Sequence, residues 1–143
     1  MNLPHDYSAA ASAKPAGNVT LSVDELDSIE SNAPKEFGGP GDQWSPEDLL
    51  VAAVADCFVL SFRAIAGMSK FEFTDISAKV TGTLDKVERD IQFTALSIVA
   101  NLTLPAGADE SRAQRLLEKA EATCFITNSL KAEPHLEANI TVA

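Results

Sequence analysis

The strongest constraint on the fold is an apolar helical segment that begins at residue 45. Ser45 is a typical helix N-cap and has, together with Asp48, the spacing of a capping box. Pro46 suits the first helical position, and Glu47 places negative charge at the positive end of the helix dipole. The run from Leu49 to Ile65 is apolar on most of its faces. The pattern therefore predicts a long central helix that the rest of the protein covers nearly all round.

The same segment does not have the pattern of a membrane span. Its longest apolar run, Leu49 to Leu60, is broken by Asp56 and closed by Arg63, so it falls short of the roughly 20 residues that a membrane helix needs. Ala66 and Gly67 are expected to end the helix. We therefore predict a buried core helix and no membrane partner.

The flanking segments alternate between apolar and polar residues in the way typical of strands. The predicted elements are strands at 18–26, 74–84, 91–104 and 136–142, and a second helix that starts after the N-cap Asp109 and carries an apolar stripe to Cys124. The two central strands form a hairpin candidate, in which a change of apolar phase near Ala95 indicates a bulge. Residues 7–14 show only weak patterning, and Pro and Gly make residues 32–44 an irregular loop. This order of elements predicts an α+β fold.

The length of the chain fits a single domain over residues 1–143. It has 143 residues, 45% of them apolar, and no internal repeat or linker. The 11 Lys and Arg against 21 Asp and Glu give a net charge of −10, which repels phosphate backbones. Residues 1–13 lack the cationic start and apolar stretch of a secretory signal. We therefore expect a cytoplasmic protein that binds no nucleic acid.

Several common catalytic and metal-binding motifs are missing from the sequence. The glycines at 38, 39 and 41 are not followed by the lysine of a phosphate-binding loop, and no serine has the nucleophile-elbow pattern. His5 and His135 could join the two cysteines on paper, but no pair has the short ligand spacing of a zinc ribbon or finger. The sequence thus disfavours a nucleotide enzyme, a serine hydrolase and a zinc site.

Two cysteines remain as candidates for chemistry. Cys57 lies about four turns into the long helix, and Cys124 lies at the end of the second predicted helix, each on an apolar face. In a reducing compartment, two such residues are either packing thiols or a redox pair. A reactive thiol would need a nearby cation, helix end or hydrogen-bond donor to lower its pKa. The residues alone leave both alternatives open.

The longer motifs resemble the OsmC/Ohr family of thiol-dependent peroxidases. The resemblance is carried by EFGGPGDQWSPEDLLVAAVADCF, by LLEKAEATCFITNSLKAE after two predicted strands, and by the terminal strand. It implies an OsmC-like fold, in which antiparallel sheets surround the long buried helix. It also implies an intertwined homodimer with active sites at the subunit interface, and a reaction that uses no metal, haem or flavin cofactor.

The resemblance assigns roles to three residues. Cys57 matches the peroxidatic cysteine, whose thiolate attacks an organic hydroperoxide, or hydrogen peroxide, and becomes a sulfenic acid. Cys124 matches the resolving cysteine, which forms a disulfide that an external dithiol or lipoylated protein reopens. Glu47 matches the family glutamate at the helix start. The rise of an ideal helix separates Glu47 from Cys57 by about 15 Å, so the two cannot touch within one helix.

The sequence departs from the family pattern in one respect. The family places an arginine before the helix, where it bridges glutamate and thiolate, whereas the first arginine here is Arg63. Lys35 and Lys14 are the nearest cations in the matching region, and a lysine lacks the planar fork of arginine. Lys35 is the candidate active-site cation, with a solvated loop lysine as the alternative.

Two functions follow from this comparison with the family. The first is a thiol-dependent reductase of organic hydroperoxides, and the second is a catalytically weak relative that binds small molecules or senses redox state. The aromatic candidates for a pocket that holds the organic tail of a hydroperoxide are Phe37, Trp44, Phe58 and Phe125. Core packing is the alternative fate of these four side chains.

Overall fold

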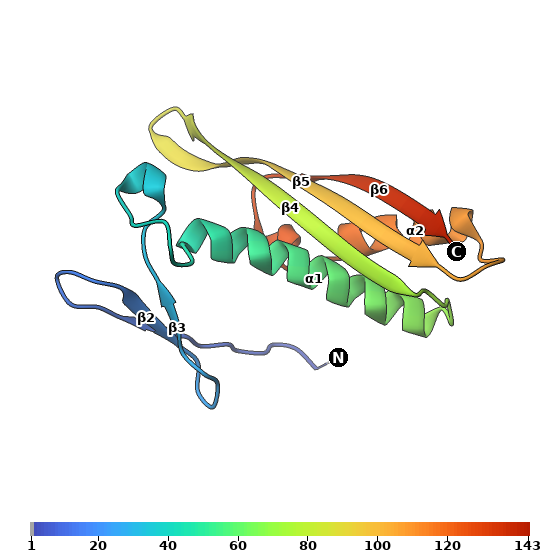
Figure 1. Cartoon of the computed structure of the whole chain (residues 1–143), viewed down its shortest axis with the longest axis horizontal. Coiled ribbons are helices and arrows are strands. Elements are labelled where there is room, and N and C mark those ends of the chain that lie inside the picture. Colours follow the sequence, from blue (N-terminus) through green and yellow to red (C-terminus); the bar gives the residue numbers. More distant parts are fainter. Residues whose placement is uncertain (1) are drawn as a thin grey trace. The chain divides into compact units, whose positions relative to one another are not determined.

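The computed structural model describes residues 2–143 and divides into two compact units, of which the first ends at Leu50 and the second begins at Val51. In chain order (Figure 1), the elements are β1 (Ala10–Ser12), β2 (Val19–Ser22), β3 (Ile29–Ser31), the 3-10 helix η1 (Lys35–Phe37), α1 (Pro46–Met68), β4 (Asp75–Val87), β5 (Asp90–Leu104), α2 (Glu110–Ala122), the 3-10 helix η2 (Thr127–Ser129) and β6 (Pro134–Val142). The α+β class predicted from the sequence is confirmed.

The first unit is built on an antiparallel sheet of β1, β2 and β3. The strand β2 lies within the predicted segment, whereas β1 falls in the weakly patterned residues 7–14, where no strand was expected. Its three small residues pair with β2 through the backbone, so their side chains show no alternation. A parallel bridge between Ser31 and Trp44 then closes the irregular loop before α1.

The capping signals at both helices are confirmed. The Ser45 backbone N–H donates to the Asp48 carboxylate at 3.1 Å, and the Asp48 N–H donates to the Ser45 hydroxyl at 3.0 Å. This reciprocal pair satisfies two backbone N–H donors at the helix start, as a capping box does. The Asp109 side chain likewise accepts from the Arg112 N–H and begins α2.

The second unit contains the predicted hairpin of β4 and β5. The register shifts between Thr83 and Leu84, since Ala95 and Phe93 are their partners and Thr94 is left over. This confirms the bulge expected near Ala95. At Gly82 an added Cβ would lie 2.8 Å from the Phe93 ring and 2.9 Å from a Val51 methyl group, so a larger residue would displace one of these side chains.

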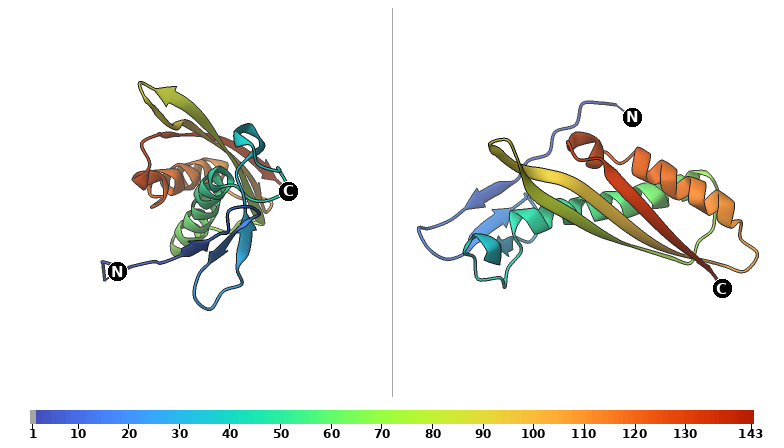
Figure 2. Two further views of the ribbon diagram at one scale, coloured as in Figure 1. Left: turned by 90° about the vertical axis from the view of Figure 1, so that its left-hand side faces the viewer. Right: turned by 90° about the horizontal axis from the view of Figure 1, so that it is seen from above.

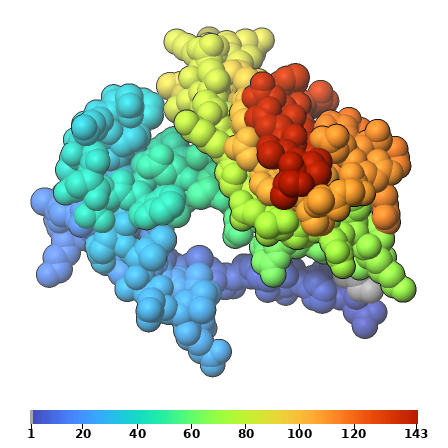
Figure 3. All heavy atoms as spheres, turned by 45° about the vertical axis from the view of Figure 1, so that its right-hand side comes forward, coloured from blue at the N-terminus to red at the C-terminus, as the bar shows by residue number. Residues whose placement is uncertain are grey.

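The third strand of this sheet corrects the expectation of antiparallel sheets. The strand order is β4-β5-β6, and β6 runs parallel to β5, from the pair Leu96 and Pro134 to the pair Leu104 and Val142. The chain returns through α2 between these strands, and such a helical crossover brings the next strand back in the same direction. In the space-filling view, β6 (red) lies against orange residues that include α2 (Figure 3).

The core of the second unit lies between one face of this sheet and the two helices (Figure 2). Its fully buried members are contributed by all three layers, and they include Val54, Phe58 and Phe62 of α1, Ile98, Leu102 and Leu104 of β5, and Leu117 of α2. The opposite face of β6 carries Glu137, Asn139 and Thr141, which are exposed. The alternation along the strands therefore sets which face the helices cover.

The helix α1 is less covered than the sequence predicted. Only one stripe of it is buried, and Leu60 on another face is 51% exposed. The single chain does not cover this helix all round, because α2 and the β4-β5-β6 sheet contact α1 from one side. A second layer for the remaining apolar surface is not supplied by the described residues of the second unit.

The length of α1 also corrects the sequence analysis. Its most apolar 18 residues have a mean hydropathy of 2.0, so by length and composition the helix could cross a membrane. The core helix of a soluble protein passes the same test, and the finding is weak evidence for a membrane span.

Candidate active site

Cys57 lies on α1 at the border of the buried stripe. Its neighbour Phe58 is fully buried, as is Val54 one turn earlier, whereas the Cys57 side chain is only half-buried. The packing of Phe58 and Val54 against the core therefore fixes the rotation of α1 about its axis. This rotation leaves the Cys57 sulfur at the edge of the core, where it can contact both core side chains and a reactant.

Cys124 lies just beyond α2 and not on its apolar stripe, which corrects the sequence prediction. The helix ends at Ala122 with Thr123 as its C-cap, and Cys124 is 1% exposed in the turn that follows. The Cys124 carbonyl accepts from the Asn128 N–H at 3.0 Å and from the Thr127 hydroxyl at 3.2 Å. These bonds hold the segment after Cys124 in a compact helical turn.

The two cysteine side chains shift each other's pKa in opposite directions. Burial acts to raise the pKa of the Cys57 thiol, but the hydrogen bond from the Cys124 side chain and one from the Ile126 backbone act against it. Weaker hydrogen bonds from the Ser61 hydroxyl and the Phe125 backbone add to this effect. The net result is a pKa of Cys57 below its ordinary value.

The pKa of the Cys124 thiol is raised, first by burial and then by its hydrogen bond to Cys57. The side chain and backbone of Thr127 and the backbone of Ile126 lower it in part, without reversing the direction. Cys57 thus ionises before Cys124. A thiolate beside a protonated thiol is an arrangement that suits nucleophilic attack followed by thiol–disulfide exchange.

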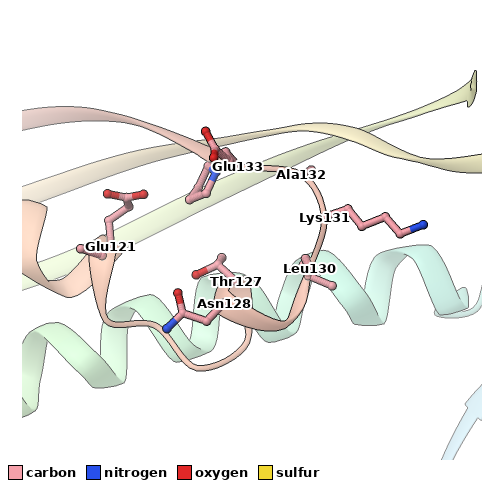
Figure 4. A pocket seen from close by; sticks show the side chains of 9 residues that line it. Glu121, Thr127, Asn128, Leu130, Lys131, Ala132 and Glu133 are labelled. Carbon is pink, nitrogen blue, oxygen red and sulfur yellow. The ribbon is translucent and has the colours of Figure 1, made fainter.

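A cavity of about 380 Å³ opens beside the Cys124 segment. Its wall includes Thr127, which is 5% exposed and contacts Cys124 directly. Glu121 and Asn128 also line the cavity, while the Lys131 side chain points away from them (Figure 4). The lining is mostly polar, so this cavity does not have the apolar character expected for the tail of an organic hydroperoxide.

The other predicted site residues are placed as follows. Lys35 is an exposed residue of η1, and its side chain runs close against Gly41. Glu47 lies in the first turn of α1, and its Oε1 atom is buried without a hydrogen-bond partner among residues 2–143. Of the four aromatic candidates, Phe58 is in the core, whereas Phe37, Trp44 and Phe125 are each more than half exposed.

Sequence reasoning missed three contributors around the Cys57 sulfur. They are the Ser61 hydroxyl, 3.9 Å from Sγ, and the backbone groups of Phe125 and Ile126. The four-residue spacing of Cys57 and Ser61 on a predicted helix was an available signal. The backbone donors carry no sequence signal, because every residue except proline has an N–H. Within residues 2–143, no three His, Cys, Asp or Glu side chains gather in a way that could hold a metal ion.

Comparisons with known proteins agree with this architecture. The family model described as OsmC-like protein matches residues 39–139. The peroxiredoxin OsmC of Escherichia coli (strain K12) is 32% identical over 93 residues, which cover 65% of this chain and 64% of that relative. An organic hydroperoxide resistance protein of Xanthomonas axonopodis pv. citri is 26% identical over 126 residues, or 86% of this chain and 84% of the relative.

The fold is also that of a solved structure. An OsmC-like protein of unknown function from Vibrio cholerae superposes with a TM-score of 0.85 at 19% identity, over 94% of this chain and 99% of that one. At this level of identity the likeness concerns the fold alone.

Proposed function

We propose, on the premise that the chain belongs to the OsmC-like protein family, that it is a thiol-dependent peroxidase that reduces organic hydroperoxides. The single observation that carries the proposal is a pair of interacting cysteines, in which the pKa of Cys57 is lowered and that of Cys124 is raised. The relatives of this chain include a peroxiredoxin and an organic hydroperoxide resistance protein, and this supports the proposed chemistry.

The proposed reaction has two steps at the cysteines. The Cys57 thiolate attacks the terminal oxygen of a hydroperoxide ROOH, the O–O bond breaks, and the leaving alkoxide takes up a proton to give the alcohol. Cys57 is then a sulfenic acid. The Cys124 thiol attacks its sulfur, water leaves, and a Cys57–Cys124 disulfide forms. Two electrons have passed from the thiols to the peroxide.

An external dithiol closes the cycle in this proposal. One of its thiolates attacks the protein disulfide and forms a mixed disulfide. Its second thiol then attacks that mixed disulfide, so the dithiol leaves as its own disulfide and both protein thiols are restored. A lipoylated protein supplies such a dithiol, and a reducing cytoplasm keeps it reduced. A cytoplasmic location and hydrogen peroxide as a second substrate are part of the proposal.

A homodimer is part of the proposal because α1 leaves apolar surface uncovered in the single chain. Leu60 is 51% and Met68 77% exposed on a helix with one buried stripe. Apolar surface of this kind is normally covered by a partner. A second copy would supply the layer that surrounds α1 in the predicted fold. Measurement of the molar mass in solution by light scattering tests this point.

Glu47 and Lys35 have supporting roles in the proposal. The buried Oε1 of Glu47 has no partner among residues 2–143, and a buried carboxylate oxygen needs a donor. Lys35 supplies positive charge in place of the arginine that precedes the helix in the family. Phe37, Trp44 and Phe125 expose aromatic surface for the organic tail, whereas Phe58 contributes packing.

Peroxide titration of the reduced protein tests the proposed function. One equivalent of an organic hydroperoxide should remove both free thiols and yield one equivalent of alcohol. The variant Cys57→Ser should consume no peroxide, and Cys124→Ser should consume one equivalent without forming an intramolecular disulfide. Survival of both wild-type thiols in excess peroxide at neutral pH would favour the catalytically weak binding or sensing relative instead.

A further inference from the structure

Ser61 is the polar residue of α1 that is turned toward the core near Cys57. Beyond the first turn of α1, the charged residues Asp56 and Arg63 are exposed, whereas Ser61 is half-buried. Serine forms helices less well than alanine, and a buried hydroxyl costs free energy unless it has a hydrogen-bond partner. We therefore expect the Ser61 hydroxyl to form a hydrogen bond within the protein.

That partner is a sulfur atom and not the backbone. Elsewhere in the second unit, the hydroxyls of Thr123 and Ser129 donate to carbonyls four residues earlier, at 2.8 and 2.9 Å. This back-bond is the common one for serine and threonine in helical backbone. The Ser61 hydroxyl also reaches four residues back, but it lies 3.9 Å from the Sγ atom of Cys57.

We propose that Ser61 is a catalytic residue, whose hydroxyl donates a hydrogen bond to the ionised sulfur of Cys57 and holds it in the nucleophilic state. The inference rests on the proposed function, because it concerns the same reacting sulfur. Ser61 keeps its own proton throughout, and the proton of the Cys57 thiol passes to solvent when the thiolate forms. The lowered pKa of Cys57 agrees with a donor at this place.

A neutral donor is well suited to this particular site. A thiolate at the edge of an apolar core is destabilised by burial, and each donor that faces it recovers part of that free energy. Ser61 is on the same helix as Cys57, so their relative position is fixed by the helix and not by a mobile loop. Ser61 thereby does from the helix what Ile126 and Phe125 do from the segment after Cys124.

The experiment measures the pH profile of Cys57 alkylation in the reduced full-length protein. Iodoacetamide is applied from about pH 5 to pH 10, and mass spectrometry of the Cys57 peptide gives the rate. The variants Ser61→Thr and Ser61→Val place side chains of the same shape at position 61, and only threonine keeps the hydroxyl. The valine variant should shift the midpoint to higher pH and slow labelling at neutral pH by about threefold to tenfold, whereas threonine should retain most of the wild-type profile.

Two further variants make the result decisive. Ser61→Ala removes the hydroxyl with a good helix former and should shift the profile in the same direction as valine. Ser111→Ala makes the same change at an exposed position of α2 and should leave the profile unchanged. Equal shifts for threonine and valine, or no shift for alanine, would overturn the role of Ser61.

Peroxide consumption by the same samples separates this inference from the proposed function. Wild-type reduction of the hydroperoxide together with an unshifted Ser61→Val profile would overturn the role of Ser61 alone. If the Ser61→Val profile is shifted but the wild-type protein reduces no hydroperoxide, the proposed function is overturned, while the hydrogen bond from Ser61 to the thiolate stands.

Discussion

The surroundings of Cys57 and of Cys124 differ both in burial and in the groups that face each sulfur. Burial raises the pKa of both thiols, yet only that of Cys57 ends below its ordinary value. Cys124, Ser61 and two backbone groups lower the pKa of Cys57, whereas Cys57 raises that of Cys124, which Thr127 and Ile126 lower only in part. The comparison teaches that the groups facing Cys57 together outweigh its burial, whereas those facing Cys124 do not, so Cys57 ionises first.

The largest expected effect comes from removing the residue that holds Cys57 in register. Phe58 is fully buried, so Phe58→Ala should lower the free energy of unfolding by about 3–5 kcal/mol. The Cys57 alkylation profile should also move toward that of free cysteine, because α1 is no longer held against the segment after Cys124. Urea denaturation measures the first effect and labelling measures the second.

The matched control is Phe37→Ala, which removes the same atoms from a side chain that is 58% exposed. It should cost less than about 1 kcal/mol. If the Cys57 alkylation profile stays unchanged in a destabilised but folded Phe58→Ala protein, the packing of Phe58 is not needed to keep the hydrogen-bond donors near Cys57. The contrast between the two thiols would then depend on local hydrogen bonds alone.

The second prediction concerns the relative reactivity of the two thiols. The lowered pKa of Cys57 means that its thiolate persists to lower pH than that of a free cysteine, and the raised pKa of Cys124 has the opposite effect. At neutral pH, iodoacetamide should therefore label Cys57 at least about tenfold faster than Cys124, which is also 1% exposed. Equal rates in a peptide-resolved labelling series would break the comparison.

The third prediction treats Cys124 as a hydrogen-bond donor. Cys124→Ser keeps a donor at this position and Cys124→Ala removes it, while both abolish the disulfide. The Cys57 alkylation profile should therefore remain near that of the wild type in the serine variant and shift to higher pH in the alanine variant, with about threefold to tenfold slower labelling at neutral pH. Identical profiles would mean that Ile126, Ser61 and Phe125 supply the stabilisation without Cys124.

The sequence predicted those parts of the fold that depend on local patterns. Ser45 and Asp48 fixed the start of α1, and the change of apolar phase beside Ala95 located the bulge. The prediction of an antiparallel β6 was wrong, because the alternation of apolar and polar residues is the same in parallel and antiparallel strands. The single chain buries only one stripe of α1, since an apolar surface does not say whether the same chain or a partner buries it.

The candidate site also has features that could be predicted from local sequence patterns and features that could not. Cys57 and Cys124 could be chosen from the sequence because they are its two cysteines and lie in apolar segments. Their effect on each other's pKa could not be derived, since it depends on how the turn after α2 packs against α1. The backbone groups of Phe125 and Ile126 were equally hidden, because their effect comes from position and not from residue type.

The smallest expected effect tests whether a cation adds to the neutral donors. Lys35 is exposed, and an exposed charge is screened by water and salt. Lys35→Ala should therefore slow Cys57 labelling at neutral pH by no more than about threefold, and added salt should reduce the difference. Lys14→Ala removes an equally exposed lysine and controls for the change in net charge. If Lys35→Ala slowed labelling more than Ser61→Val does, a cation would dominate the ionisation of Cys57, and the contrast between the two thiols could no longer be explained by their hydrogen-bond donors.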